Sequence, residues 1–117
     1  LGPPIGWPVQ YRLTGPDVPL DGRRAHALTL AVHELATNAA KYGALSVDDG
    51  WVDVLWSNAG GRLELLWREC GGPIVTPPTH GGFGSTLITF NLPTAFSGEV
   101  DLRFETGGVE CRLRSSI

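Results

Sequence analysis

One segment, residues 21–43, has the apolar spacing of a long amphipathic helix and sets what the rest of the chain can fold into. Asp21 is a residue type favoured at the N-cap, and Gly43 is a natural C-terminal stop. We expect the apolar stripe between them to bury against a sheet. Its members recur at intervals of three and four residues: Ala25, Leu28, Val32, Leu35, Ala39 and Tyr42.

The segments around this helix alternate between apolar and polar residues, which is typical of strands. Residues 7–13 (WPVQYRL) are a first candidate strand, and Pro8 favours a place at a sheet edge. Residues 51–56 and 62–69 alternate around an Asn-Ala-Gly-Gly turn. Together they predict a β-hairpin.

The second half of the chain continues this pattern. Residues 71–84 form a Gly- and Pro-rich loop, and residues 85–91 predict a short helix that ends before Pro93. Residues 99–105 and 109–116 predict a second hairpin around a Thr-Gly-Gly turn. This order indicates an α+β fold, a two-layer α/β sandwich whose mixed, mostly antiparallel sheet has helices on one face. The other face is expected to be partly solvated or covered by another domain.

Bulk composition limits the class of protein. The 117 residues suit one domain, 1–117, and no apolar run approaches the roughly 18 residues of a membrane span. A net charge of −3 argues against nucleic acid as a partner, because phosphate binders usually present a basic surface. Two widely spaced cysteines and no visible signal peptide favour reduced thiols in the cytoplasm. The sequence contains no methionine, so we expect a fragment of a longer chain.

Polar residues form a line along the long helix, beside the apolar stripe. Glu34, Asn38 and Lys41 are four and three residues apart, so they follow one another on neighbouring turns. Carboxylate and amide oxygens suit Mg²⁺, which takes further ligands from water and substrate phosphates. The lysine suits a phosphate oxygen. The alternative is a solvated helix face whose polar residues only hydrogen-bond with one another.

Two glycine-containing motifs favour a nucleotide as the ligand. Gly82 and Gly84 precede a predicted helix, where backbone N–H groups and the helix N-terminus attract anions. Glu69 ends a predicted strand and is followed by Gly71 and Gly72. Its carboxylate can accept a hydrogen bond from an adenine amino group while the glycines let a purine approach. The alternatives are a flexible turn at the first motif and a surface glutamate at the second.

In order along the chain, HELATNAAKYGALS, WRECGGP and GFGSTLI resemble the N, G1 and G2 boxes of histidine-kinase ATP-binding domains. More narrowly, they resemble the HWE family of bacterial sensor histidine kinases. That family is named for a His in the N box and a Trp-x-Glu in the G1 box, here His33, Trp67 and Glu69. The resemblance spans most of the chain, residues 8–114. It implies the sandwich shared with gyrase, heat-shock chaperone and mismatch-repair ATPases, with ATP and Mg²⁺ between helices and sheet.

The resemblance also implies roles for matching residues. Asn38 would be the Mg²⁺ ligand, and Glu34 the catalytic acidic residue that polarises the accepting histidine or a water. Glu69 would read the adenine amino group, and residues 73–81 would form the ATP lid. His33 is counted with the nucleotide-binding residues, although it alternatively only hydrogen-bonds within the helix layer. The other nucleotide-binding positions would be Lys41, Tyr42, Gly71, Gly72, Gly82, Phe83, Gly84, Ser85 and Thr86.

Two residues depart from the wider superfamily pattern. Glu69 is one methylene longer than the usual G1 aspartate, so the purine would sit differently or be met through water. Pro73 replaces the second G1 glycine, which would stiffen the start of the lid.

The implied activity is transfer of the ATP γ-phosphoryl group to a histidine on an adjoining helical hairpin, and from there to a response regulator. No such hairpin is recognisable, because His26 lies in the long helix and His80 in the loop. We therefore expect the catalytic part alone, without its phosphoacceptor and sensor domains and without membrane contact. Two alternatives stay open: a degenerate nucleotide-binding or docking module without transfer activity, and an anti-sigma-type serine kinase, which the Trp-x-Glu pair and GGP disfavour.

Overall fold

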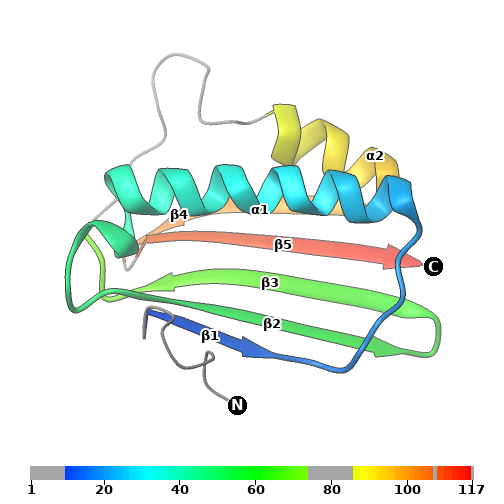
Figure 1. Cartoon of the computed structure of the whole chain (residues 1–117), viewed down its shortest axis with the longest axis horizontal. Helices are drawn as coiled ribbons and strands as arrows, with labels where there is room; N and C mark the ends of the chain where they lie inside the picture. Colours follow the sequence, from blue (N-terminus) through cyan, green and yellow to red (C-terminus); the bar gives the residue numbers. More distant parts are fainter. Residues whose placement is uncertain (1–9, 74–85, 107, 117) are drawn as a thin grey trace.

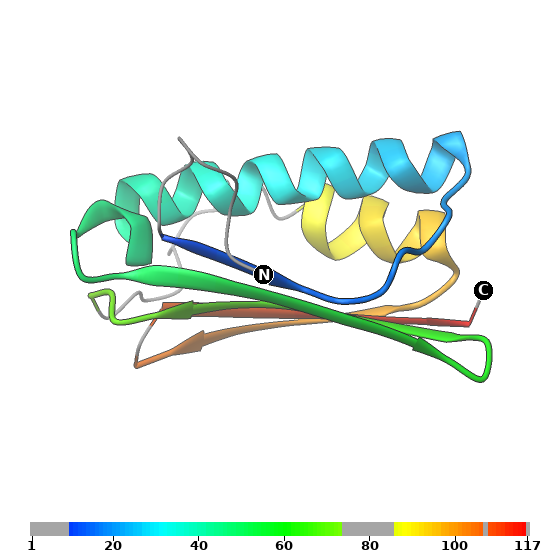
Figure 2. The ribbon, with the colours of Figure 1, turned by 60° about the horizontal axis from the view of Figure 1, so that its bottom comes forward.

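The computed structural model describes residues 10–73, 86–106 and 108–116, which form two layers (Figures 1 and 2). One layer is a five-stranded sheet in the order β1-β2-β3-β5-β4. β1 runs parallel to β2, and the other neighbouring pairs are antiparallel. The predicted α+β sandwich with a mixed sheet is confirmed. The strands are β1 (Tyr11–Thr14), β2 (Trp51–Ala59), β3 (Arg62–Cys70), β4 (Glu99–Glu105) and β5 (Gly108–Ser116).

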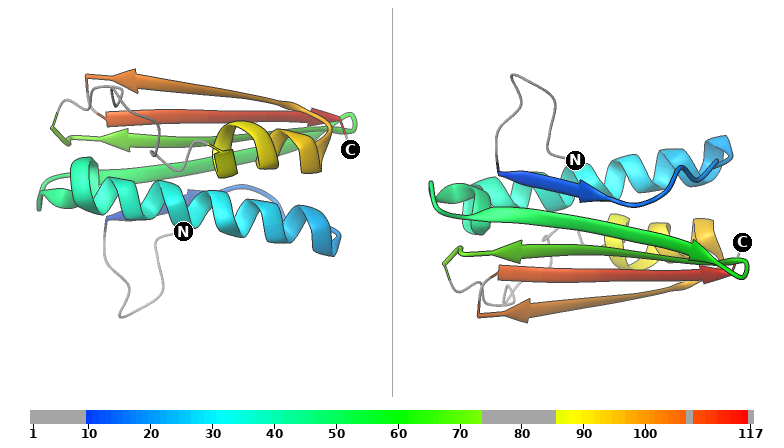
Figure 3. Two further views of the ribbon diagram at one scale, coloured as in Figure 1. Left: turned by 90° about the horizontal axis from the view of Figure 1, so that it is seen from above. Right: turned by 90° about the horizontal axis from the view of Figure 1, so that it is seen from below.

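The second layer covers one face of this sheet. Helix α1 (Gly22–Tyr42) crosses it lengthwise and ends in a short 3₁₀ turn, η1 (Ala44–Ser46). A π-helical segment, η2 (Thr86–Asn91), continues directly into α2 (Leu92–Phe96). Both pack beside α1 (Figure 3). Among the helices that the structure describes, none combines the length and apolar character needed to cross a membrane.

Helix α1 begins where the sequence predicts, but only Leu35 and Ala39 of the predicted stripe are among its buried residues. The Asp21 side chain accepts a hydrogen bond from the Arg24 backbone N–H at 2.8 Å, as expected of an N-cap. Tyr42, predicted to end the buried stripe, is 57% exposed, and Leu28 and Val32 pack only at the margin of the core. Small side chains let the helix approach its neighbours closely, so the core contact runs mainly along alanines. The buried residues are Ala27, Ala31, Leu35, Asn38 and Ala39.

Both predicted hairpins are present. The first turns at Gly60 and Gly61, whose φ angles of 61° and 77° are the two positive values that a two-residue type I′ turn requires. Its strands run on to Ala59 and Cys70, beyond the predicted ends. In the second hairpin β4 pairs with β5, and β5 in turn pairs with β3. This last pairing places the two hairpins in one sheet.

The prediction that the second helix ends before Pro93 is wrong. The helical chain passes through this residue and ends at Phe96. Pro93 lies in the first turn of α2, directly after the junction with η2. The segment buries Ile88, Leu92 and Phe96 against α1 and the sheet, which favours continuing the helix.

The core lies between the layers and is built on the inward-facing residues of every second strand position. Burial of each large side chain stabilises the fold by roughly 1.5–3 kcal/mol. The largest fully buried side chains of the core are Trp67, Phe96, Ile88, Leu92 and Leu113.

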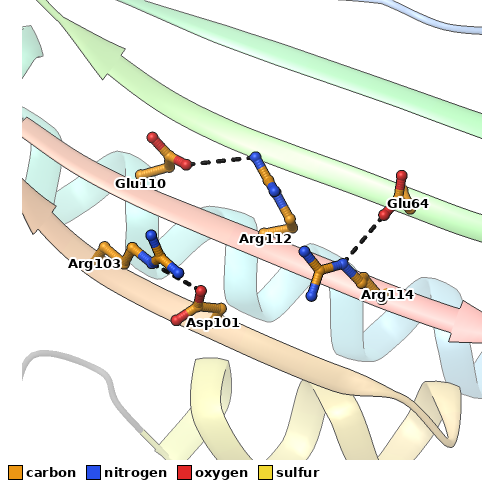
Figure 4. Close-up of polar contacts among 6 residues, drawn as sticks. All are labelled: Glu64, Asp101, Arg103, Glu110, Arg112 and Arg114. Carbon is orange, nitrogen blue, oxygen red and sulfur yellow. Dashed lines mark hydrogen bonds and ion pairs between the residues drawn. The ribbon is translucent and has the colours of Figure 1, made fainter.

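The opposite face of the sheet carries charged side chains in ion pairs (Figure 4). Their exposure is that of the solvated face of a sheet. Each exposed pair contributes at most about 1 kcal/mol to the stability of the fold. Those drawn in the figure are Arg103–Asp101 at 2.8 Å, Arg114–Glu64 at 3.2 Å and Arg112–Glu110 at 3.6 Å.

Candidate nucleotide site

Strand β3 ends beneath the C-terminal end of α1 (Figure 1), and Glu69 is its second-last residue. Its side chain is on the inner face, and the residue is only 5% exposed. Oε1 accepts a hydrogen bond from the Ala44 backbone N–H at 3.0 Å. Oε2 accepts one from the Trp67 indole Nε1–H at 3.3 Å. The alternative of a surface glutamate is therefore wrong, because this carboxylate is buried and bridges a strand to the turn after α1.

Glycines from two parts of the chain leave room for the Glu69 side chain, and a third leaves room for Ala44. A Cβ on Gly43 would overlap Glu69 Oε1, and a Cβ on Gly108 would lie 2.6 Å from the Glu69 Cβ. A Cβ on Gly72 would lie 2.5 Å from the Ala44 Cα. Gly43 does end α1, with its N–H bonded to the Ala39 carbonyl at 3.0 Å, but its φ of −115° lies outside the left-handed region. Glycine is needed there for space.

The glycines that follow β3 have separate structural reasons. Gly71 has a φ of 71°, a conformation that turns the chain out of the strand and favours glycine. Gly72 packs on Ala44, as described above. Backbone geometry and close packing thus account for two glycines that the sequence linked only to a purine.

Tyr11 completes the surroundings of Glu69 from the edge strand. Its ring meets the Trp67 indole edge-on, with centroids 6.2 Å apart and planes at 69°. Burial raises the pKa of Tyr11, and the negative charge of Glu69 raises it further. Sequence reasoning missed Tyr11, Ala44 and Gly108, because nothing local shows which strand pairs with which.

The polar residues of the long helix lie on its last three turns, in the C-terminal half of the helix. Asn38 is 8% exposed, so the expectation that it lies off the buried face is wrong. Glu34 is half-buried, whereas His33 and Lys41 are exposed and Tyr42 projects toward solvent. Asn38 is five residues before Gly43, about 7–8 Å along the helix axis. The structure therefore brings an amide, a carboxylate and the Glu69 carboxylate to one end of the sandwich.

Part of the predicted phosphate-binding loop lies outside the described residues, namely Gly82, Phe83, Gly84 and Ser85, together with lid residues 74–81. Thr86 is described and begins η2, the segment that packs against α1. Pro73 is the last described residue on the other side.

Glu34 and Asn38 fit a Mg²⁺ ion that takes one or two protein ligands and completes its shell with water and phosphate oxygens. Within the described ranges, no group of three His, Cys, Asp or Glu residues could hold a metal by itself.

Comparison with known proteins points to one group. The chain is 39% identical over 104 residues to blue-light-activated histidine kinase 1 of Erythrobacter litoralis, a match that covers 86% of this chain and 28% of that protein. The chain is a relative of the histidine kinases. It spans little more than a quarter of the length of this relative. No family model matches the sequence.

Solved structures agree on the fold of this histidine-kinase relative. The histidine kinase domain of Erythrobacter litoralis EL346 superposes with a TM-score of 0.74 at 19% identity, covering 91% of this chain and 53% of that one. Full-length ShkA in complex with AMPPNP gives 0.61 at 22% identity, covering 91% and 25%. ThkA in complex with the response regulator TrrA gives 0.60 at 12% identity, covering 90% and 34%. At these identities the likeness establishes the fold, that of a histidine-kinase catalytic domain.

Proposed function

We propose that the chain binds Mg²⁺–ATP at the C-terminal end of α1 and transfers the γ-phosphoryl group to a histidine. The observation that carries this proposal is the buried Glu69 carboxylate beneath the helix that also bears Glu34 and Asn38. The related fold of ShkA, determined with the ATP analogue AMPPNP, supports the choice of nucleotide.

Glu69 is the proposed adenine-reading group. A carboxylate accepts about four hydrogen bonds, and two are taken by Ala44 and Trp67, so each oxygen can accept another. The exocyclic amine of adenine can donate to it, whereas the carbonyl of guanine cannot. An unmatched buried polar group costs about 1–3 kcal/mol, which predicts roughly tenfold or weaker binding of GTP.

The end of α1 would receive the phosphates. Asn38 and Glu34 would hold Mg²⁺, which neutralises phosphate charge, and Lys41 would contact a phosphate oxygen. Glu34 would also polarise the accepting group. Catalysis would come from positioning and from electrostatic stabilisation of the transferring phosphoryl group.

The proposed partners are a phosphoacceptor helical hairpin of the same kinase and then a response regulator in two-component signalling. The complex of the fold-relative ThkA with its regulator supports this kind of partner. Transfer requires the acceptor nitrogen in line with the γ-phosphate, which neither His26 nor His80 is expected to provide.

The transfer proposal is tested with radiolabelled ATP. We expect little label on this chain alone, and acid-labile, base-stable label once a phosphoacceptor hairpin is added in trans. Stoichiometric acid-labile label on the chain alone would show that the acceptor is misplaced. No label with any kinase hairpin, despite ATP binding, would favour the second candidate.

That second candidate is a docking or nucleotide-binding module without transfer activity. It is favoured by the fact that both oxygens of Glu69 already accept hydrogen bonds from the protein. A Glu69→Ala variant separates the two roles of this carboxylate. Loss of the ATP-over-GTP preference supports adenine recognition, whereas lower stability with an unchanged preference assigns Glu69 to structure alone. Glu64→Ala, on the solvated face of the same strand, is the matched control.

A further inference from the structure

We propose that Trp67 is the positioning residue for adenine recognition: its indole N–H fixes the Glu69 carboxylate and thereby sets the preference for ATP over GTP. This inference rests on the proposed function and assigns a role to a residue that does not itself touch the nucleotide.

The first step is the geometry of β3. Trp67 and Glu69 are two residues apart, so both project from the inner face of the strand. Trp67 is 1% exposed, and a buried indole N–H needs an acceptor. Its acceptor is Glu69 Oε2 at 3.3 Å. The partner of this tryptophan is therefore a carboxylate rather than a backbone carbonyl.

The second step is that the two carboxylate oxygens are held by different elements. Ala44 N–H, at the start of η1, holds Oε1, while the indole on β3 holds Oε2. One donor alone would leave the carboxylate free to rotate about its last bond. Two donors on separate elements fix its plane, so the remaining lone pairs have defined directions.

The third step is that Trp67 is itself held from several sides. Tyr11 meets its ring edge-on, and the ring belongs to the same buried cluster as Leu35 and Leu113. Gly43 and Gly108 pack closely around Glu69 and limit other side-chain positions. A phenylalanine at position 67 would keep an aromatic ring there, but it would remove the N–H donor together with part of the buried indole volume.

The test uses Trp67→Phe, with Trp56→Phe as the matched control. Trp56 is a partly buried tryptophan on β2 whose indole N–H donates to the Pro16 carbonyl at 2.5 Å, away from Glu69. We measure dissociation constants for Mg²⁺–ATP and Mg²⁺–GTP by isothermal titration calorimetry, and the unfolding midpoint of each variant. Trp67→Phe should weaken ATP binding about tenfold and leave GTP binding nearly unchanged. Trp56→Phe should leave the ratio of the two constants at the wild-type value.

A purely structural role would lower the unfolding midpoint of Trp67→Phe without moving the ATP/GTP ratio, and that result overturns the inference. Failure of wild type to bind ATP overturns the proposed function as well, so the two failures are distinguishable. If Trp67→Phe does not fold, nuclear magnetic resonance of the wild-type indole N–H groups decides. ATP, but not GTP, should shift the Trp67 signal, with the Trp56 signal as the internal reference. Equal or absent shifts at Trp67 overturn the inference.

Discussion

Gly43→Ala is expected to destabilise the fold even though φ at this position is not left-handed. The φ of Gly43 is −115°, so no left-handed strain is involved. The new Cβ would instead occupy the place of Glu69 Oε1 and push the carboxylate away from the Ala44 N–H. Gly22→Ala is the matched control, since a Cβ there meets nothing within 4 Å.

The magnitude follows from the contact that is lost. A hydrogen bond to a charged group contributes about 1.5–3 kcal/mol, and replacing glycine returns about 0.4–1 kcal/mol through the unfolded state. The net loss is thus about 0.5–2.6 kcal/mol. For 117 residues the unfolding entropy is about 0.25 kcal/mol per kelvin, which predicts a midpoint lowered by roughly 2–10 °C. Gly22→Ala should raise it by about 2–4 °C.

Differential scanning calorimetry of the variants measures these shifts, and Gly43→Asn discriminates between two explanations. A left-handed helix stop would accept asparagine better than alanine. A lack of space predicts that asparagine is at least as damaging. An unchanged midpoint for Gly43→Ala, or full rescue by asparagine, would refute the steric reasoning.

Three further outcomes are expected. Asn38→Ala should abolish the Mg²⁺-dependent part of ATP binding. Because Asn38 is buried, the substitution should also lower the free energy of unfolding by about 1 kcal/mol. Equal ATP affinity with and without Mg²⁺ in both the wild type and the variant would contradict the assignment. Burial, with a smaller effect of Asp101, raises the pKa of Cys111 to about 12, so at pH 8 only about one thiol in 10⁴ is ionised. Ellman's reagent should therefore titrate one thiol, Cys70, in the native chain and two after denaturation, and two fast native thiols would disprove the burial of Cys111. Residues 73–81, with three prolines and few apolar anchors, should exchange amide hydrogens quickly without nucleotide and more slowly with an ATP analogue; strong protection without nucleotide would argue against a lid.

Local patterns in the sequence predict the elements well because their causes are local. The Asp21 cap, the alternation in both hairpins and the paired glycines at 60 and 61 act within a few residues. The predicted buried face of α1 is only partly right, with Leu35 and Ala39 buried, and the difference has a physical reason. Hydropathy favours large residues such as Tyr42, whereas close packing of a helix on a sheet favours alanines.

The site shows the same division. Glu34, Asn38 and Glu69 were found from residue type and spacing, and the structure places them toward one end of the sandwich. Their neighbours Tyr11, Ala44 and Gly108 come from segments whose proximity depends on sheet order, which short-range patterns do not contain. The structure also gives a different reason for glycine at position 43. The sequence suggests a helix stop, whereas in the structure the Glu69 side chain, 26 residues further along the chain, leaves no room for a Cβ.

The shortest strand has a consequence for how the fold opens locally. β1 has only four residues and lies at the sheet edge, and such strands have the lowest free energy of local unfolding. It is tied to the loop after η1 by the Gln10 side-chain amide, which donates to the carbonyls of Val47 and Gly50 at 3.0 Å each. Detachment of β1 would take Tyr11 away from the Trp67 ring. Local unfolding of β1 would therefore loosen the packing around Trp67, whose indole N–H donates to the Glu69 carboxylate. The free-energy cost would be well below that of unfolding the whole domain.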